Sequence, residues 1–375
     1  MATRLQHIME LDGLRGIAAI AVFFHHLSFA SIDQTSNLWG PAISSVCRLS
    51  RYGLYGVDLF FVLSGYLITT ILLKDRNSAN YYFNFYWKRA LRILPLYLIT
   101  LFVAWVWFQA SIGGVTVSIL FLANFGRLMH VDIGGPFWTL AIEEQFYLVW
   151  PQIVRRLRVN QIKKVALTIV IVEPVLRLIA TAFHHYDFLL TFFRCDGLAL
   201  GALLACQLSC GDRNRSATPG RRRKMLAVWI LLFSCIFLAF TGKLLSSPKF
   251  FMQGSALFLS AINLCFYSCI RIAVGNSGAR FLAVFRSSVL VFFGEISYCM
   301  YMSHTYVMRV YDDWRGPLVA GRTLDYWVRI TSVFCATVVV CIISRYALEL
   351  PCMSLRKYVL RKSKPPVYAP QTVES

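Results

Sequence analysis

Charged side chains are scarce in this sequence, and acidic ones are the scarcest. Of 375 residues only 15% are charged, with 18 acidic residues against 38 Lys and Arg, while 57% are hydrophobic and the mean hydropathy is +0.58. So little polar surface cannot cover a soluble globule, so the composition predicts an all-α, multi-pass protein in a lipid bilayer. The first apolar run shows no small-residue cleavage pattern, and we expect its helix to be retained.

Metal-binding and disulfide patterns are also missing. Eleven cysteines lie mostly in apolar runs and none belongs to a CxxC motif, which is typical of small buried hydrophobic residues, so we predict no metal site. The net charge of +20 comes mostly from short loops between apolar runs. This is the positive-inside pattern of membrane proteins, and we predict no nucleic-acid partner.

The apolar runs predict ten membrane spans with both termini in the cytoplasm. We place them at residues 11–30, 55–73, 93–110, 137–154, 165–183, 189–209, 225–245, 250–270, 288–308 and 328–350. The aromatic and basic stretch before residue 93 is expected to be a separate interfacial helix. Residues 115–125 are too few to cross and are predicted to be re-entrant or interfacial. We assign 1–352 to one transmembrane domain and 353–375 to a basic cytoplasmic tail.

Ionisable side chains inside such a bundle are costly in lipid and therefore mark a functional path. With this topology they fall into two layers. The outer layer contains His26, Asp58, Glu143, Glu144, Arg194, Asp196 and His304, and the inner layer contains Asp12, Arg15, Arg89, Arg92, Glu295 and Glu349. Charges close in sequence are expected to form structural ion pairs, namely Asp12 with Arg15 and Arg194 with Asp196. As a set, the two layers indicate two ends of one polar passage.

Arg15 and His26 belong to the same predicted helix. Three helical turns separate them, so both side chains leave one face, roughly 16 Å apart. His25 points away from that face, and either histidine could instead only bond a neighbouring helix. Arginine binds phosphates through its planar fork, and a histidine near carboxylates is typical of a general base with an orienting partner. A phosphorylated cytosolic donor and a hydroxyl acceptor from the opposite side would use both layers.

Several ordered blocks of the sequence resemble the acyltransferase-3 family of bacterial integral-membrane O-acyltransferases. The blocks are LDGLRGIAAIAVFFHH, GVDLFFVLSGYLIT, KRALRILP with its Arg-x2-Arg, WTLAIEEQFYLVWP, FRCDGLALGALLA, GEISYCMYMSH and the ELP near Glu349. The likeness covers about residues 9–352. Two departures from the family pattern are Thr139, where serine is common, and Ser303, where tryptophan is common.

The resemblance implies a membrane O-acyltransferase, expected to be an O-acetyltransferase of the bacterial inner membrane. Cytosolic acyl-CoA, in the form of acetyl-CoA, would be the donor and a hydroxyl of a cell-surface or secreted glycan the acceptor. The residues implied are His26 as the catalytic histidine, Glu143 or Glu144 in the same site, and Arg15, Arg89 and Arg92 for acyl-CoA. We expect the acceptor to meet Asp58, Asp196 and His304.

Several alternatives stay open at this point. We expect the short form of the family, without an SGNH-type esterase domain, whose acceptors include exopolysaccharide, O-antigen, macrolides and lipochitooligosaccharide nodulation signals, and the residues do not separate these. His26 can act as a general base or carry the acyl group itself. A multi-pass transporter or flippase of a glycolipid is the alternative function, although the sequence shows no repeated halves and no Gly- or Pro-broken span pair.

Overall fold

The computed structural model describes residues 7–32, 50–131, 133–183, 187, 189–211, 228–238, 248–316 and 323–359. These residues form helices and irregular segments without a strand, which confirms the predicted all-α class. The helices are α1 Met9–Ile32, α3 Gly56–Lys74, α4 Tyr81–Val106, α5 Ile112–Ile119, α6 Phe137–Arg156, α7 Val159–Ala182, α8 Cys195–Gly211, α10 Pro248–Gly275, α11 Ser288–Glu295, α12 Ser297–Arg315, α13 Thr323–Ser344, α14 Leu350–Ser354 and α15 Arg356–Val359. A further apolar helix is Val228–Leu238.

Five helical segments in the described part of the chain are long and apolar enough to cross a membrane. They are Arg51–Lys74, Tyr81–Val106, Val159–Ala182, Leu257–Gly275 and Leu324–Tyr358. Their outward surfaces are apolar: Phe102 and Trp105 on α4 and Ile171 and Val175 on α7 are all exposed. Large apolar side chains gathered on an outer surface are unfavourable in water and expected against lipid. The protein is therefore a polytopic membrane protein, as the composition predicts.

A described helix covers at least part of every predicted span, but two predictions on continuity are wrong. The stretch before residue 93 is not a separate interfacial helix, because α4 runs unbroken from Tyr81 to Val106 with Pro95 inside it. Proline is tolerated within a membrane helix where neighbouring groups satisfy the freed backbone. The expected span 288–308 is broken at Ile296, where φ of −91° and ψ of 2° end α11 before α12 begins.

The segment predicted not to cross contains a helix of only eight residues, α5. Eight residues reach about 12 Å, well below the roughly 30 Å of a bilayer core, in keeping with that prediction. Of the span expected at 225–245, residues 228–238 form a helix and the others lie outside the described residues.

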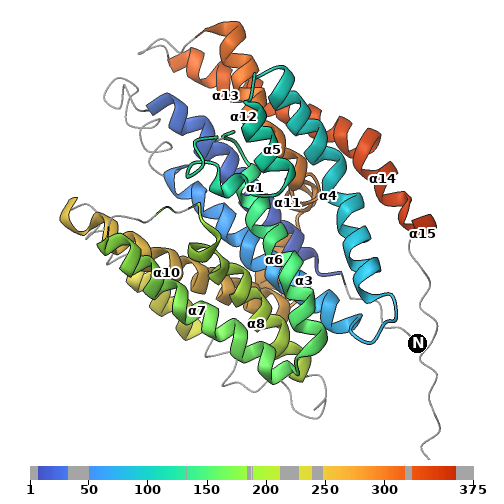
Figure 1. Cartoon of the computed structure of the whole chain (residues 1–375). Coiled ribbons are helices and arrows are strands. Elements are labelled where there is room, and N and C mark those ends of the chain that lie inside the picture. Colours follow the sequence, from blue (N-terminus) through green and yellow to red (C-terminus); the bar gives the residue numbers. More distant parts are fainter. Residues whose placement is uncertain are drawn as a thin grey trace, which may run out of the picture.

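Two central helices, α1 and α3, separate two groups of helices (Figure 1). The helices α7, α8 and α10 pack together on one side, and α4, α12, α13 and α14 lie on the other. One core cluster joins α3, α4 and α6 through residues such as Phe61, Tyr97 and Trp150. A second joins α3, α8 and α10 through residues such as Leu63 and Ile270. The centre of the molecule therefore has packed walls on both sides.

Close helix crossings depend on glycine. A Cβ atom at Gly65 of α3 would lie 1.9 Å from the carbonyl oxygen of Leu198 on α8. A Cβ atom at Gly294 of α11 would lie 2.1 Å from the carbonyl oxygen of Asp12 on α1. Small residues let membrane helices approach until their backbones touch, which maximises van der Waals contact. These crossings hold α1 and α3, which carry several of the predicted site residues, against their neighbours.

The helical chain continues beyond α13 and runs along α4. A π-helical turn, Arg345–Glu349, leads into α14, which has Pro351 near its start, and both α14 and α15 contact α4. The first residues of the predicted tail, 353–359, therefore pack on the bundle, and 360–375 lie outside the described residues. The domain boundary at residue 352 stays a prediction.

Candidate active site

A cavity of about 430 Å³ opens between α1, α3, α4, α6, α12 and α15. Small-molecule sites commonly have volumes of ~300–1,000 Å³. The cavity brings together Arg15 from α1 with Arg89 and Arg92 from α4, the three residues expected to bind the donor. Apolar side chains such as Phe60 and Leu67 complete its walls.

These guanidinium groups are attracted by nearby carboxylates but form no direct pair with any described residue. Within the described ranges, Arg15, Arg89 and Arg92 make no hydrogen bond or ion pair, and the buried Nε of Arg15 has no partner. Arg92 is repelled by both of the others. The guanidinium carbon of Arg89 lies 4.5 Å from the ring centroid of Tyr147. Several arginines around one cavity without a direct partner among the described residues favour an anionic ligand, because each guanidinium presents five donors.

Glu143 faces this cavity rather than the histidine. Its Oε2 accepts a hydrogen bond of 3.0 Å from the Tyr147 hydroxyl, which is also bonded to the Ser64 hydroxyl. Arg89 and Arg15 attract its carboxylate. Sequence spacing groups Glu143 with His26 at one depth, whereas the structure places it with the arginines. Glu144 does not line the cavity, and among the described residues its buried Oε1 has no partner.

His26 contacts a second histidine, His304 of α12. The Nδ1 of His26 lies 3.0 Å from the Val22 carbonyl oxygen and 3.2 Å from Nε2 of His304, and the Nδ1 of His304 lies 2.9 Å from the Met300 carbonyl oxygen. Because a carbonyl oxygen only accepts, each Nδ1 carries the proton when the rings are neutral. The Nδ1 proton of His26 is then shared between the Val22 oxygen and His304. The Nε2 of His26 makes no hydrogen bond with a described residue, so its lone pair can accept a proton.

An arginine side chain of α13 binds the backbone of α1 beside His26. Arg329 of α13 donates 3.1 Å to the carbonyl oxygen of Leu27, the residue after His26, and makes hydrogen bonds of 2.7 and 2.8 Å to Asp312. His25 points elsewhere, with its Nδ1 3.2 Å from the Ser50 carbonyl oxygen. Sequence reasoning missed Arg329, whose only signal is an isolated charge in an apolar run.

Tyr301 lies between the cavity and the histidine pair. Its side chain lines the cavity, its hydroxyl is 2.8 Å from Oγ1 of Thr139, and its ring centroid is 6.0 Å from that of His304. The described residues that line this cavity include neither His26 nor His304. The arginines therefore line the cavity, the histidine pair lies outside its described lining, and the Tyr301 ring contacts both.

Comparison with known proteins identifies the family of this chain. A model of the acyltransferase-3 family, described as an acyltransferase domain, matches residues 8–346. The chain belongs to the acyltransferase-3 family. The predicted family and the predicted enzyme class, an O-acyltransferase, are therefore confirmed. No solved structure matches the chain.

The chain is similar to several curated bacterial proteins. It is 28% identical over 327 residues to "Peptidoglycan O-acetyltransferase OatA" of Listeria monocytogenes, covering 80% of this chain and 49% of the relative. It is 25% identical over 337 residues to "Putative O-acetyltransferase SACOL0978" of Staphylococcus aureus, covering 80% and 50%. It is 36% identical over 166 residues to "Putative peptidoglycan O-acetyltransferase YrhL" of Bacillus subtilis, covering 39% and 23%. The chain spans at most about half the length of these relatives.

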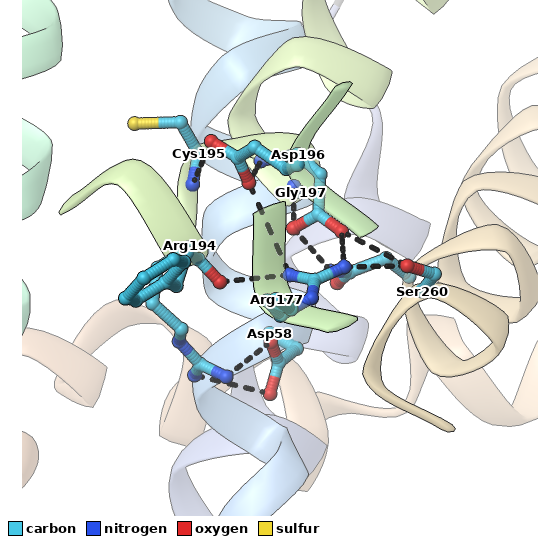
Figure 2. Close-up of polar contacts among 10 residues, drawn as sticks. Asp58, Arg177, Arg194, Cys195, Asp196, Gly197 and Ser260 are labelled. Atoms are coloured by element: carbon cyan, nitrogen blue, oxygen red, sulfur yellow. Dashed lines mark hydrogen bonds and ion pairs between the residues drawn. The ribbon is translucent and has the colours of Figure 1, made fainter. Parts of the chain in front are cut away.

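Asp58 and Asp196 of this acyltransferase belong to a buried ion network outside the cavity. Arg177 of α7 donates a hydrogen bond of 2.6 Å to Oδ2 of Asp196 (Figure 2) and another of 2.7 Å to the carbonyl oxygen of Phe193. Arg194 pairs with Asp58 at 3.2 Å. The expected pair of Arg194 and Asp196 is therefore wrong: Arg194 precedes α8 and pairs with Asp58 of α3, while Asp196 pairs with Arg177 of α7. Sequence reasoning also missed Arg177, whose signal is Glu173 four residues before it in an otherwise apolar run.

Glu173 completes the network at the start of α8. Its two carboxylate oxygens accept hydrogen bonds of 3.0 and 2.7 Å from the backbone N–H groups of Cys195 and Asp196. Such bonds and the helix dipole stabilise a carboxylate at a helix N-terminus. The other expected local pair is also wrong: Asp12 forms its ion pair with His7, at 2.7 Å, rather than with Arg15.

Proposed function

We propose that this membrane O-acetyltransferase binds acetyl-CoA in the arginine-lined cavity and transfers the acetyl group to a glycan hydroxyl at the histidine pair. The supporting observation is a contrast between two sets of arginines. Arg177 and Arg329 are paired with carboxylates, whereas Arg15, Arg89 and Arg92 form no ion pair with any residue that the structure describes. The phosphates of a CoA thioester would supply the missing acceptors, in the bidentate geometry that arginine favours.

The histidine pair supplies the base in this proposal. The Nε2 of His26 takes the proton from the acceptor hydroxyl while the hydroxyl oxygen bonds to the thioester carbonyl carbon. The carbon–sulfur bond then breaks, and the leaving thiolate takes the proton from the imidazolium of His26. As that ring becomes positive, its Nδ1–H bond to Nε2 of His304 strengthens. We therefore assign the orienting role to His304, and general-base help of this kind is worth ~10²- to 10⁴-fold in rate.

The acidic residues predicted for the site have different roles in this proposal. Glu143 would hold Arg15 and Arg89 at the donor end rather than stabilise His26. Asp58 and Asp196, which already pair with arginines, would keep α3, α7 and α8 in place. Glu144, whose buried Oε1 has no partner in the described part of the chain, remains a proposed site residue beside the cavity.

A carbohydrate acceptor follows from the family, and peptidoglycan is the acceptor that the printed name of the Listeria relative gives. For this chain we propose a hydroxyl of a cell-envelope glycan. The donor would enter from the cytosol and the acceptor from the opposite side of the inner membrane, with both termini in the cytoplasm. Tyr301 would then mark the boundary that the acetyl group crosses.

The experiment uses purified protein in nanodiscs with labelled acetyl-CoA and a panel of envelope glycans, peptidoglycan fragments first. We expect acetyl transfer to at least one glycan. Arg89→Lys keeps the charge but loses the planar fork, so it should weaken CoA binding about tenfold, whereas Arg156→Lys, exposed on α6, should not. Failure of the wild type to bind CoA would refute the proposal and favour a flippase.

A further inference from the structure

A fourth arginine lines the donor cavity, and it comes from outside the family region. Arg356 is in α15, ten residues beyond the match that ends at residue 346 and beyond the domain boundary expected at 352. Its helix packs on α4, which carries Arg89 and Arg92. The C-terminal segment therefore adds a guanidinium to a cavity built by the transmembrane helices.

Arg356, like the other cavity arginines, has no ion-pair partner among the described residues. It makes no hydrogen bond or ion pair with any described residue, and its buried Nε has no partner. Its positive charge is close enough to repel both Arg89 and Arg92. Holding like charges together in this way is unfavourable unless an anion joins them. The next residue, Lys357, is exposed and lies 4.9 Å from the ring centroid of Tyr358.

The charges around the cavity indicate how many negative charges the anion should carry. Four arginines and Lys88 line it, against the carboxylates of Asp12 and Glu143. Lys88 is ion-paired with Asp75, and Asp12 contacts His7, which is charged only when protonated. The four guanidiniums therefore face two carboxylates in the cavity lining, Asp12 and Glu143, so positive charge remains in excess. A ligand with several negative charges at separated positions matches this excess, and a single phosphate does not.

We propose that Arg356 is a donor-binding residue that contacts a phosphate of acyl-CoA and makes the C-terminal segment part of the donor site. This rests on the proposed function. The same phosphate chemistry occurs in the headgroup of an anionic lipid, so the experiment must separate the two sources. If Arg356 had only a structural role, its replacement would lower acetyl transfer equally from donors with and without phosphates. Comparing the two kinds of donor therefore provides a second readout.

The test compares Arg356→Ala with the matched control Lys357→Ala, which removes the adjacent positive charge without touching the cavity. Both proteins are placed in nanodiscs of phosphatidylcholine, with and without phosphatidylglycerol, and CoA binding is measured by calorimetry. We expect Arg356→Ala to weaken CoA binding about ten- to a hundredfold in both lipids, as for the loss of a charge-assisted hydrogen bond, and Lys357→Ala to change it less than twofold. Acetyl transfer from S-acetylpantetheine, which has no phosphate, should be unchanged in both variants.

The outcomes separate this inference from the function on which it rests. Equal CoA affinity in wild type and Arg356→Ala, alongside weakened binding in Arg89→Ala, overturns the role of Arg356 and leaves the donor cavity intact. A defect seen only with phosphatidylglycerol assigns Arg356 to a lipid headgroup and also overturns it. Equal losses with acetyl-CoA and S-acetylpantetheine would show a structural role instead. Absence of CoA binding in the wild type removes both proposals.

Discussion

Replacing Arg177 by methionine should destabilise the protein strongly. Arg177 has no exposed surface, and its guanidinium lies 2.6 Å from Asp196 and 3.9 Å from Glu173. Its loss leaves three buried carboxylates, the third being Asp58, with Arg194 as the remaining cation of the network. Removing one partner of a buried ion pair costs ~3–5 kcal/mol, because the other charge stays buried without compensation. In a protein of this size we expect Tm to fall by about 4–6 °C.

The assay is thermal unfolding of the purified protein in detergent, followed by tryptophan fluorescence. Methionine suits the change because its unbranched chain occupies the space of the arginine stem. Arg156→Met, at an exposed position on α6, is the control and should leave Tm within about 1 °C. Adding Asp196→Asn to Arg177→Met should restore part of the loss, because it removes one uncompensated charge. A single variant as stable as the control, or a double variant that loses the sum of both effects, would refute this explanation.

Three further predictions follow from the geometry. His304→Asn should lower kcat for acetyl transfer about tenfold or more with little change in the KM for acetyl-CoA. A rise in KM as large as the fall in kcat would refute an orienting role. Gly65→Ala should lower Tm by several degrees because its Cβ would meet a backbone oxygen of α8 at 1.9 Å, while Gly275→Ala, with open space around it, should not; equal effects would contradict the crossing. Reporter fusions after Lys164 and Lys224 should both report the cytoplasm, and a periplasmic signal from either would overturn the predicted topology.

Hydrophobic runs alone locate the helices, because a bilayer demands about 20 apolar residues for each crossing. The break at Ile296 and the unbroken α4 were not predictable in this way. The break follows a glycine, Gly294, whose packing against Asp12 of α1 is a contact between segments nearly three hundred residues apart. Where α4 begins is likewise decided by its neighbours, since an aromatic and basic stretch is equally typical of an interfacial helix.

Motifs correctly singled out Arg15, Arg89 and Arg92 as a group, and the structure gathers them at one cavity. Spacing along the chain gives the face of a helix that a residue occupies, but neither the rotation of that helix nor the helix opposite it. For this reason the contact of His26 with His304 was not predictable. For the same reason the sequence did not predict that Arg356 lines the cavity, because its position depends on how α15 packs on α4.

The most direct test of the account is single-turnover acetyl transfer by His26→Ala, measured together with CoA affinity. Because neither histidine of the pair is among the described residues that line the arginine cavity, we expect transfer to fall by ~10²- to 10⁴-fold while the Kd for CoA stays within about twofold of wild type. Rapid quenching of the wild type with labelled acetyl-CoA and no acceptor should leave no label on the protein. Retained transfer in His26→Ala, or a labelled protein species that depends on His26, would contradict the general-base account, and the label would favour a covalent acyl-histidine.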